Sequence, residues 1–246
     1  MERWKDQGIV IGVRKHGEGG TVVTLLTANH GKHAGYVHGG ASSQRLRANL
    51  QPGSVADVEW SAQSMDQLGT FTIEDAQNMN AGYLDDAAAL AALQSMCALV
   101  ERSVPEREPH PGLYEGSKVF LELLGQDRDV WGAMYVFWEL ALLREMGFAL
   151  DLSKCAVTGE TENLRFVSPK TGKAVSEAGA GTYKDRLLPL PGFLSGGHDS
   201  SDSAVLEGLK LSAHFIEHRL FAHTTHTMPE ARTRLPGFFE AKPASL

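Results

Sequence analysis

Residues 8–40 read "GIVIGVRKHGEGGTVVTLLTANHGKHAGYVHGG" and determine how the N-terminal part of the chain is built. The first apolar run is rich in Ile and Val and breaks at the glycine-rich "HGEGG" of residues 16–20. The second run contains two similar segments that meet at Asn29, His30 and Gly31. Short runs of this composition, bounded by Gly and Asn, are typical of β-strands joined by turns. This stretch therefore predicts three consecutive strands.

Two further strands are predicted downstream. Residues 53–62, "GSVADVEWSA", alternate apolar and polar side chains as a half-buried strand does. Residues 69–77, "GTFTIEDAQ", are predicted to form the last strand of the set. Five short strands within about 80 residues suit a small closed barrel, and an OB-fold is the natural match in size.

After residue 81 the spacing of apolar residues changes to that of helices. Alanine- and leucine-rich segments bounded by Pro or Gly predict helices over residues 83–104, 110–126, 129–150 and 203–223. We expect an α+β protein: an OB-fold barrel in residues 1–80 and a helical domain in residues 81–246. A turn-rich region, residues 153–185, interrupts the helices and has the outline of a zinc ribbon.

The zinc-ribbon outline lacks most of its ligands. The four positions where two knuckles would present ligands hold Cys155, Thr158, Ser176 and Gly179. Structural zinc needs four good nitrogen or sulfur ligands, and one thiolate cannot supply them. We expect no metal here, a hairpin held by packing, and Cys155 as a small buried apolar side chain.

The stretch "HFIEH" raises the alternative of a metal-dependent hydrolase. It places His214, Glu217 and His218 in the H-x-x-E-H arrangement, with two imidazoles one helical turn apart. A third ligand would have to come from Glu230 or Glu240, and no long helix follows to present either one. The polar face of a terminal helix explains the motif as well, so the hydrolase stays an alternative.

Composition narrows the other classes. The chain has 246 residues, 42% hydrophobic and 22% charged, and only two cysteines, Cys97 and Cys155. These values are typical of a globular protein of a reducing compartment, and the best apolar run, residues 87–100, is too short to cross a bilayer. We expect a cytoplasmic protein. No P-loop, complete dinucleotide fingerprint or G-x-S-x-G is present, so we expect no enzymatic activity and no cofactor.

Charge is distributed unevenly along the chain. The formal net charge is −7, but residues 10–50 contain five basic residues and one acidic residue, Glu18. A cationic barrel surface with stacking aromatics is typical of single-strand binding. The predicted DNA contacts are Arg14, Lys15, Lys32, Arg45 and Arg47. Trp4, Tyr36, Trp60 and Phe71 are candidates for stacking or for the barrel core.

Four stretches, in order, carry a resemblance to the RecO family of bacterial recombination mediators. They are "GIVIGVRKHGEGGTVVTLLTANHGKHAGYVHGG", "RLRANLQPGSVADVEW", "WELALLREMGFALDLSKCAVTGE" and "VSPKTGKAVS". The resemblance implies an N-terminal OB-fold, a helical domain and a zinc-ribbon-like insertion. The chain departs from many members in keeping one of four zinc cysteines and in having "HGGASSQ" where a more basic segment is common.

The resemblance also implies a function and partners. Members bind single- and double-stranded DNA, anneal complementary strands without ATP, and help load recombinase onto strands coated by single-strand-binding protein. The implied partners are RecR and the C-terminal tail of single-strand-binding protein, and we expect that tail near Phe137, Leu140 and Arg144. Residues 1–80 contain seven basic and eight acidic residues, which keeps open a scaffolding subunit that binds no DNA.

Overall fold

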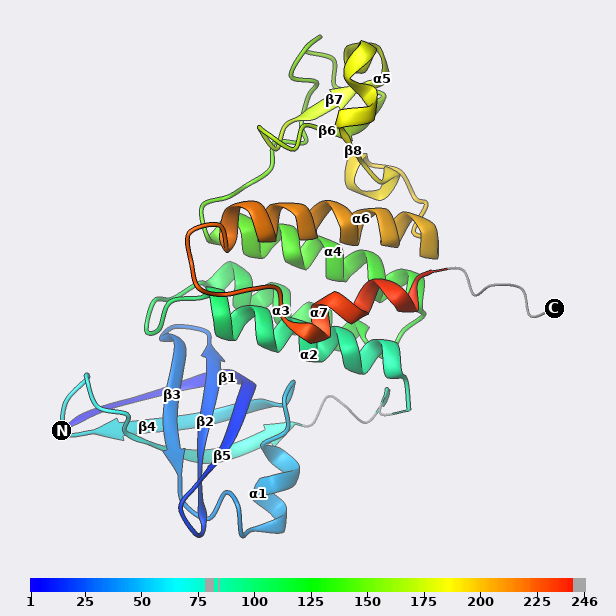
Figure 1. Cartoon of the computed structure of the whole chain (residues 1–246). Helices are drawn as coiled ribbons and strands as arrows, with labels where there is room; N and C mark the ends of the chain where they lie inside the picture. The colour runs from blue at the N-terminus through cyan, green and yellow to red at the C-terminus, as the bar shows by residue number, and fades with distance from the viewer. Residues whose placement is uncertain (78–81, 84, 241–246) are drawn as a thin grey trace. The chain divides into compact units, whose positions relative to one another are not determined.

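The computed structural model describes residues 1–77, 82, 83 and 85–240. The chain divides into two compact units, Met1–Gly125 and Gln126–Leu246. The domain boundary expected between residues 80 and 81 lies outside the described residues and remains a prediction. Figure 1 shows both units as ribbons, each containing strands and helices, so the predicted α+β class is confirmed.

Five strands of the first unit form a closed barrel with the order β1-β2-β3-β5-β4. Their bounds are β1 Glu2–His16, β2 Gly20–Thr27, β3 Gly31–Val37, β4 Val55–Ala62 and β5 Thr70–Gln77. The barrel closes where Tyr36 of β3 meets Thr70 of β5 in a parallel contact, and the other pairings are antiparallel. All five predicted strands are present. The first begins six residues early, because residues 2–7, which are polar apart from Trp4, pair with β4 although they form no apolar run.

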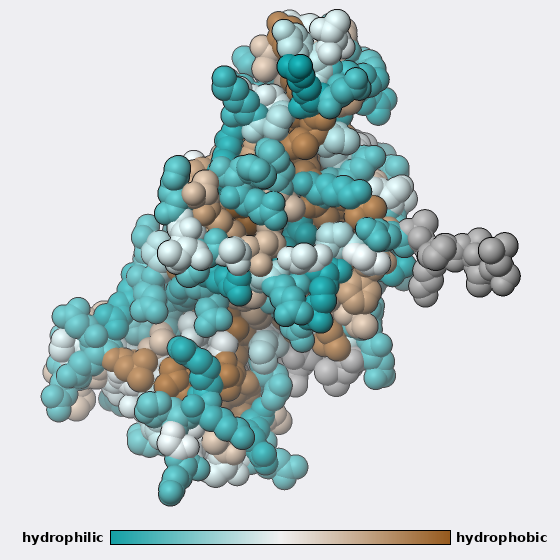
Figure 2. Space-filling view, in the orientation of Figure 1, coloured by the Kyte–Doolittle hydropathy of each residue, from teal (hydrophilic) through white to brown (hydrophobic). Residues whose placement is uncertain are grey.

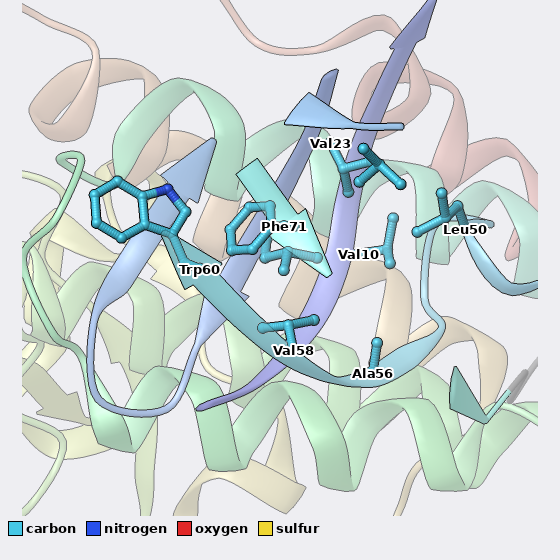
Figure 3. Packing of buried hydrophobic residues seen from close by; sticks show 9 residues of the cluster. Val10, Val23, Leu50, Ala56, Val58, Trp60 and Phe71 are labelled. Carbon is cyan, nitrogen blue, oxygen red and sulfur yellow. The ribbon is translucent and has the colours of Figure 1, made fainter. Parts of the chain in front are cut away.

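Side chains fill the barrel. Val10, Val58, Trp60 and Phe71 are buried in its core, as Figure 3 shows. Gly35 of β3 permits this packing, because a Cβ there would lie 2.3 Å from the Phe71 ring. The Trp60 ring is held in place because its Nε1 donates a hydrogen bond to the Leu68 carbonyl at 3.0 Å. Close packing of this kind predicts that ligands bind to the outer surface of the barrel.

A short helix and two longer ones complete the first unit. They are α1 Gln44–Asn49, α2 Ala87–Ser103 and α3 Pro111–Leu123. The Asp86 carboxylate caps α2 by accepting from the N–H groups of Ala88 and Ala89, as expected for an N-cap aspartate. Helix α2 lies against β1, where the Cys97 sulfur is 4.0 Å from the Val10 carbonyl. Among the described residues, no helix has both the length and the apolar character to cross a membrane.

The second unit is built on helices α4 and α6, which lie side by side (Figure 1). The helices are α4 Arg128–Glu145, α6 Asp202–Phe215 with a π-helical turn at Ile216–Leu220, and α7 Glu230–Arg234. A buried ion pair fastens α7 to the other two. The Arg232 guanidinium bonds the Glu139 carboxylate of α4 and also donates to the Leu209 carbonyl of α6 at 2.6 Å.

Between α4 and α6 the chain forms a small insertion with a three-stranded sheet of order β7-β6-β8. Its elements are β6 Leu164–Val167, β7 Ala174–Ser176, α5 Glu177–Ala180, a 3-10 helix at Gly181–Arg186 and β8 Leu188–Pro189. The insertion corresponds to the region where a zinc-ribbon outline is predicted. That likeness remains a prediction, and the sheet is what the structure establishes.

Candidate nucleic-acid interface

The end of β1 presents two exposed cations, Arg14 and Lys15. Arg14 lies opposite Val22, and Val22 lies opposite Tyr36 of β3. Directly paired residues point to the same face of a sheet, so Arg14 and Tyr36 share the outer face. The neighbouring Lys15 is also exposed.

Tyr36 is the centre of an aromatic cluster on this outer face. Its ring meets His16 and His38 edge-on, with centroids 6.0 and 4.7 Å apart, and both imidazoles are exposed. The ring lies across Gly20, where a Cβ would come within 1.7 Å of the Tyr36 hydroxyl. Glycine at position 20 therefore allows an aromatic side chain to cover strand β2. A half-exposed ring beside cations is a surface on which a base can stack.

Helix α1 brings two more cations to this end of the barrel. Ser43 caps the helix by accepting from the Leu46 N–H at 3.3 Å, and Leu46 packs against the barrel core. The Ala41 N–H donates to the Gly19 carbonyl at 3.4 Å, which joins the segment before α1 to the β1–β2 turn. Arg45 and Arg47 are both exposed on this helix.

We call Arg14, Lys15, Arg45 and Arg47 the cationic end of the barrel. In the part of the chain that the structure describes, none of the four forms an ion pair. Basic residues elsewhere on the barrel are neutralised, since Arg3 pairs with Glu59 and Lys5 with Glu74. The cationic end therefore keeps its charge available for an anionic ligand, although the barrel as a whole is nearly neutral.

Lys32, the fifth predicted DNA contact, is placed differently. It is 8% exposed, and its ammonium donates to the Glu101 carbonyl of α2 at 2.7 Å. Burial lowers its pKa, although Glu106 and Glu101 favour the charged form. Lys32 joins the barrel to α2, so the expectation that it contacts DNA needs correcting. Sequence could not reveal this, because a buried lysine and an exposed one look alike in a polar segment.

The remaining aromatic candidates belong to the interior. Trp60 and Phe71 are 0% and 2% exposed, which leaves no ring face for a base. Trp4 stacks on His30 at 4.0 Å and on Trp60 at 5.5 Å. Of the four candidates, only Tyr36 combines an outer-face position with neighbouring unpaired cations.

The residues expected to meet a partner tail share one stripe of α4. Phe137 is 44% exposed, Leu140 is half-buried and Arg144 is exposed, and their spacing of three and four places them on one side of the helix. Phe137 also meets the Phe193 ring at a centroid distance of 5.7 Å. Sequence placed these residues on a helix correctly, and whether a partner binds there remains a prediction.

The H-x-x-E-H residues form no metal centre. The two imidazoles stack at 4.3 Å, and Nδ1 of His218 lies 2.9 Å from the His214 backbone oxygen. Among the described residues, no group of three His, Cys, Asp or Glu side chains is arranged to hold a metal ion. The hydrolase alternative is therefore not supported.

The four zinc-ribbon positions converge around the Cys155 sulfur. The sulfur accepts hydrogen bonds from the Val157 and Thr158 N–H groups, both at 3.4 Å, and from the Ser176 N–H and hydroxyl at 3.2 and 3.3 Å. A Cβ at Gly179 would lie 2.8 Å from the sulfur. Burial raises the thiol pKa, but the hydrogen bonds from Ser176 and Thr158 outweigh it and lower the pKa to about 6. Cys155 is buried as expected, but it is a hydrogen-bonded centre rather than a plain apolar side chain.

Comparison with known proteins identifies the family. The model for "Recombination protein O N terminal" matches residues 1–78, and the model for "Recombination protein O C terminal" matches residues 84–228. The chain belongs to the RecO family. Members of this family similar to the chain include the DNA repair protein RecO of Rhodospirillum centenum, 46% identical over 94% of this chain and 92% of that protein. The DNA repair protein RecO of Ruegeria is 45% identical over 94% and 95% of the two chains, and that of Rhodospirillum rubrum 42% over 95% of each.

Proposed function

We propose that this RecO-family chain is a recombination mediator in DNA repair, which binds DNA at the cationic end of its barrel. The observation that carries the proposal is that the four cations of the cationic end form no ion pair among the described residues, with Arg14 on the same outer face as Tyr36. Relatives that cover nearly the whole chain bear the name DNA repair protein, which supports the same role. Such a protein would act in the cytoplasm.

We infer that the barrel is an OB-fold. Its support is the strand number, the closed order β1-β2-β3-β5-β4 and the short helix α1 between β3 and β4. In OB-folds the face around strands 2 and 3 commonly binds oligonucleotides. Tyr36 and Arg14 lie on that face here, which is why the proposal places DNA there.

Both single and double strands can use the cationic end. Each phosphate neutralised by Arg14, Lys15, Arg45 or Arg47 releases condensed counterions, so affinity falls steeply as salt rises. Annealing of complementary strands needs no covalent chemistry and no nucleotide cofactor. It requires two polyanions held close together with their repulsion reduced and their bases free to pair.

Two protein partners belong to the proposal. The acidic, hydrophobic C-terminal tail of single-strand-binding protein would lie on the α4 stripe, with its apolar side chains on Phe137 and Leu140 and a carboxylate on Arg144. RecR would act with the chain in loading recombinase onto coated strands. The zinc-ribbon-like insertion would fold without zinc. Of its four ligand positions only Cys155 can supply a ligand to zinc.

Equilibrium binding of a labelled oligonucleotide over a range of salt concentrations tests the DNA interface. We expect a steep linear fall of log affinity with log salt. The Arg45→Glu/Arg47→Glu variant should bind more weakly and reduce the slope by about 2, because each phosphate contact contributes about 1.

A matched control reverses two positive charges in the second unit rather than in the barrel. Lys154→Glu/Lys210→Glu alters two exposed lysines of the second unit and should leave the slope unchanged. If the Arg45/Arg47 variant kept the normal slope, the cationic end would not be the interface. Wild-type protein that failed to bind at any salt would favour a scaffolding subunit instead.

A further inference from the structure

The insertion between α4 and α6 contains a groove that the proposed function does not use. Its cavity volume is about 430 Å³. Three segments form its walls: the Cys155 turn at residues 155–158, the β6–β7 turn at residues 168–173, and the helical segment at residues 179–187. Val175 and Ala180 also line it, and both are buried.

Two large apolar side chains stand exposed in the walls of this groove. Val157 is 68% exposed and Tyr183 is 64% exposed. Apart from Met1, they are the most exposed large apolar residues in the described part of the chain. Figure 2 shows hydrophobic surface on the insertion, surrounded by hydrophilic side chains. Apolar surface that is gathered in a concave site, rather than scattered, marks a binding site.

The walls are held rigid without a ligand. In the β6–β7 turn, the Gly172 N–H donates to the Ser168 carbonyl at 2.8 Å, and the Ser168 N–H donates to the Lys173 carbonyl at 2.9 Å. From the π-helical turn, Arg219 donates to the Lys170 carbonyl at 3.0 Å and fixes the outside of the same wall. The hydrogen bonds to the Cys155 sulfur hold the opposite wall. A preformed groove of this kind loses little conformational entropy when it binds.

The charges lining the groove are of one sign. Lys170 and Arg186 line it from two different walls, and both are exposed. No carboxylate belongs to the lining, and neither cation forms an ion pair among the residues that the structure describes. The nearby Lys184 differs, because it pairs with Glu177 at 2.6 Å. The groove is thus complementary to an apolar ligand that carries negative charge on both sides.

We propose that this groove binds an extended acidic peptide segment of a partner protein. One large apolar side chain of the peptide enters between Val157 and Tyr183, and flanking carboxylates meet Lys170 and Arg186. Single-stranded DNA carries similar charge and could stack a base on Tyr183, but the rest of the lining is mainly aliphatic, which favours an apolar peptide side chain. This site is separate from the α4 stripe and does not depend on the DNA-binding role.

The test uses the full-length protein and a fluorescein-labelled heptapeptide with phenylalanine at its centre and three aspartates on each side. Fluorescence anisotropy should show saturable binding. Replacing the phenylalanine by serine, or the aspartates by lysines, should weaken binding at least about tenfold, as loss of a central anchor does. The Val157→Ser/Tyr183→Ser and Lys170→Glu/Arg186→Glu variants should each weaken it by a similar factor. All four positions are exposed, so the variants should fold.

Controls separate this groove from other sites. The titrations are made in Phe137→Ser protein, because the α4 stripe is proposed to take an acidic, hydrophobic peptide as well. In this protein the charge control Lys210→Glu should leave peptide affinity unchanged. The proposal is overturned if the peptide does not bind at millimolar protein, or if the groove variants bind it normally. A further result would also overturn it. If an oligothymidylate displaces the peptide, and the groove variants bind the oligothymidylate more weakly than the wild-type protein does, the groove is a DNA site.

Discussion

His33 is a buried imidazole without a hydrogen-bond partner. It is 1% exposed, and in the described structure neither ring nitrogen has a partner. The rings of Trp4, Trp60 and Phe71 surround it edge-on at centroid distances of 5.1, 4.9 and 6.1 Å. Burial, and to a smaller degree the charges of Arg107 and His30, lower its pKa from 6.5 to about 4. The barrel therefore requires the neutral ring.

This burial predicts acid sensitivity of the barrel. The unfolded chain takes up a proton as pH falls through about 6.5, whereas the folded chain resists until about 4, so stability is lost between these values. The free energy of unfolding should be about 2 kcal/mol lower at pH 5 than at pH 7.5. Urea unfolding at the two pH values measures it, and His33→Phe should show a smaller difference. An equal difference in the variant would contradict the assignment to His33.

Tyr36 offers a second prediction at the scale of one side chain. If a base stacks on its ring, Tyr36→Leu should weaken single-strand binding by about 1–3 kcal/mol, the usual contribution of one stacked base. Tyr36→Phe keeps the ring and should bind normally. Anisotropy titrations with a single strand and a blunt duplex should show a loss for the single strand alone, with the salt slope unchanged. A loss of equal size for the duplex would argue against stacking.

At the scale of elements, sequence predicted the regular strands and helices well. The strands carry Ile/Val runs or alternation, and α2, α3, α4 and α6 carry apolar spacing, with an aspartate cap on α2 and Pro or Gly near several boundaries. Helix α7 was not predicted, because Glu230–Arg234 has only five residues and reads as part of a polar tail. Its stability comes from Arg232, which is 1% exposed and pairs with Glu139 on another element. No local pattern encodes a partner 93 positions away.

The Arg232–Glu139 pair predicts how α7 is held. Arg232→Ala should lower the free energy of unfolding of the second unit by about 3–5 kcal/mol, because it leaves the Glu139 carboxylate buried without its partner. Chemical denaturation measures the loss. The double variant Arg232→Met/Glu139→Met replaces the pair by apolar side chains of similar length and should recover much of the stability. A double variant as unstable as Arg232→Ala would show that the pair itself is needed.

At the scale of the whole molecule, charge was harder to predict than fold. The basic window of residues 10–50 contains the four cations of the cationic end, and DNA binding there remains a prediction. Sequence could not show that Lys32 donates to the Glu101 carbonyl, or that Arg3 and Lys5 are neutralised by carboxylates of β4 and β5. Both facts depend on strand register and tertiary packing. Together they reduce the cations of the barrel to the four of the cationic end.

Annealing of two complementary labelled oligonucleotides without ATP, at low and at roughly physiological salt, tests the central claim most directly. We expect the wild-type protein to accelerate annealing, less so at the higher salt. Arg45→Glu/Arg47→Glu should abolish the acceleration, and Lys154→Glu/Lys210→Glu should retain it. No acceleration by the wild-type protein at either salt, or full acceleration by the Arg45/Arg47 variant, would contradict an annealing mediator that acts through this end of the barrel.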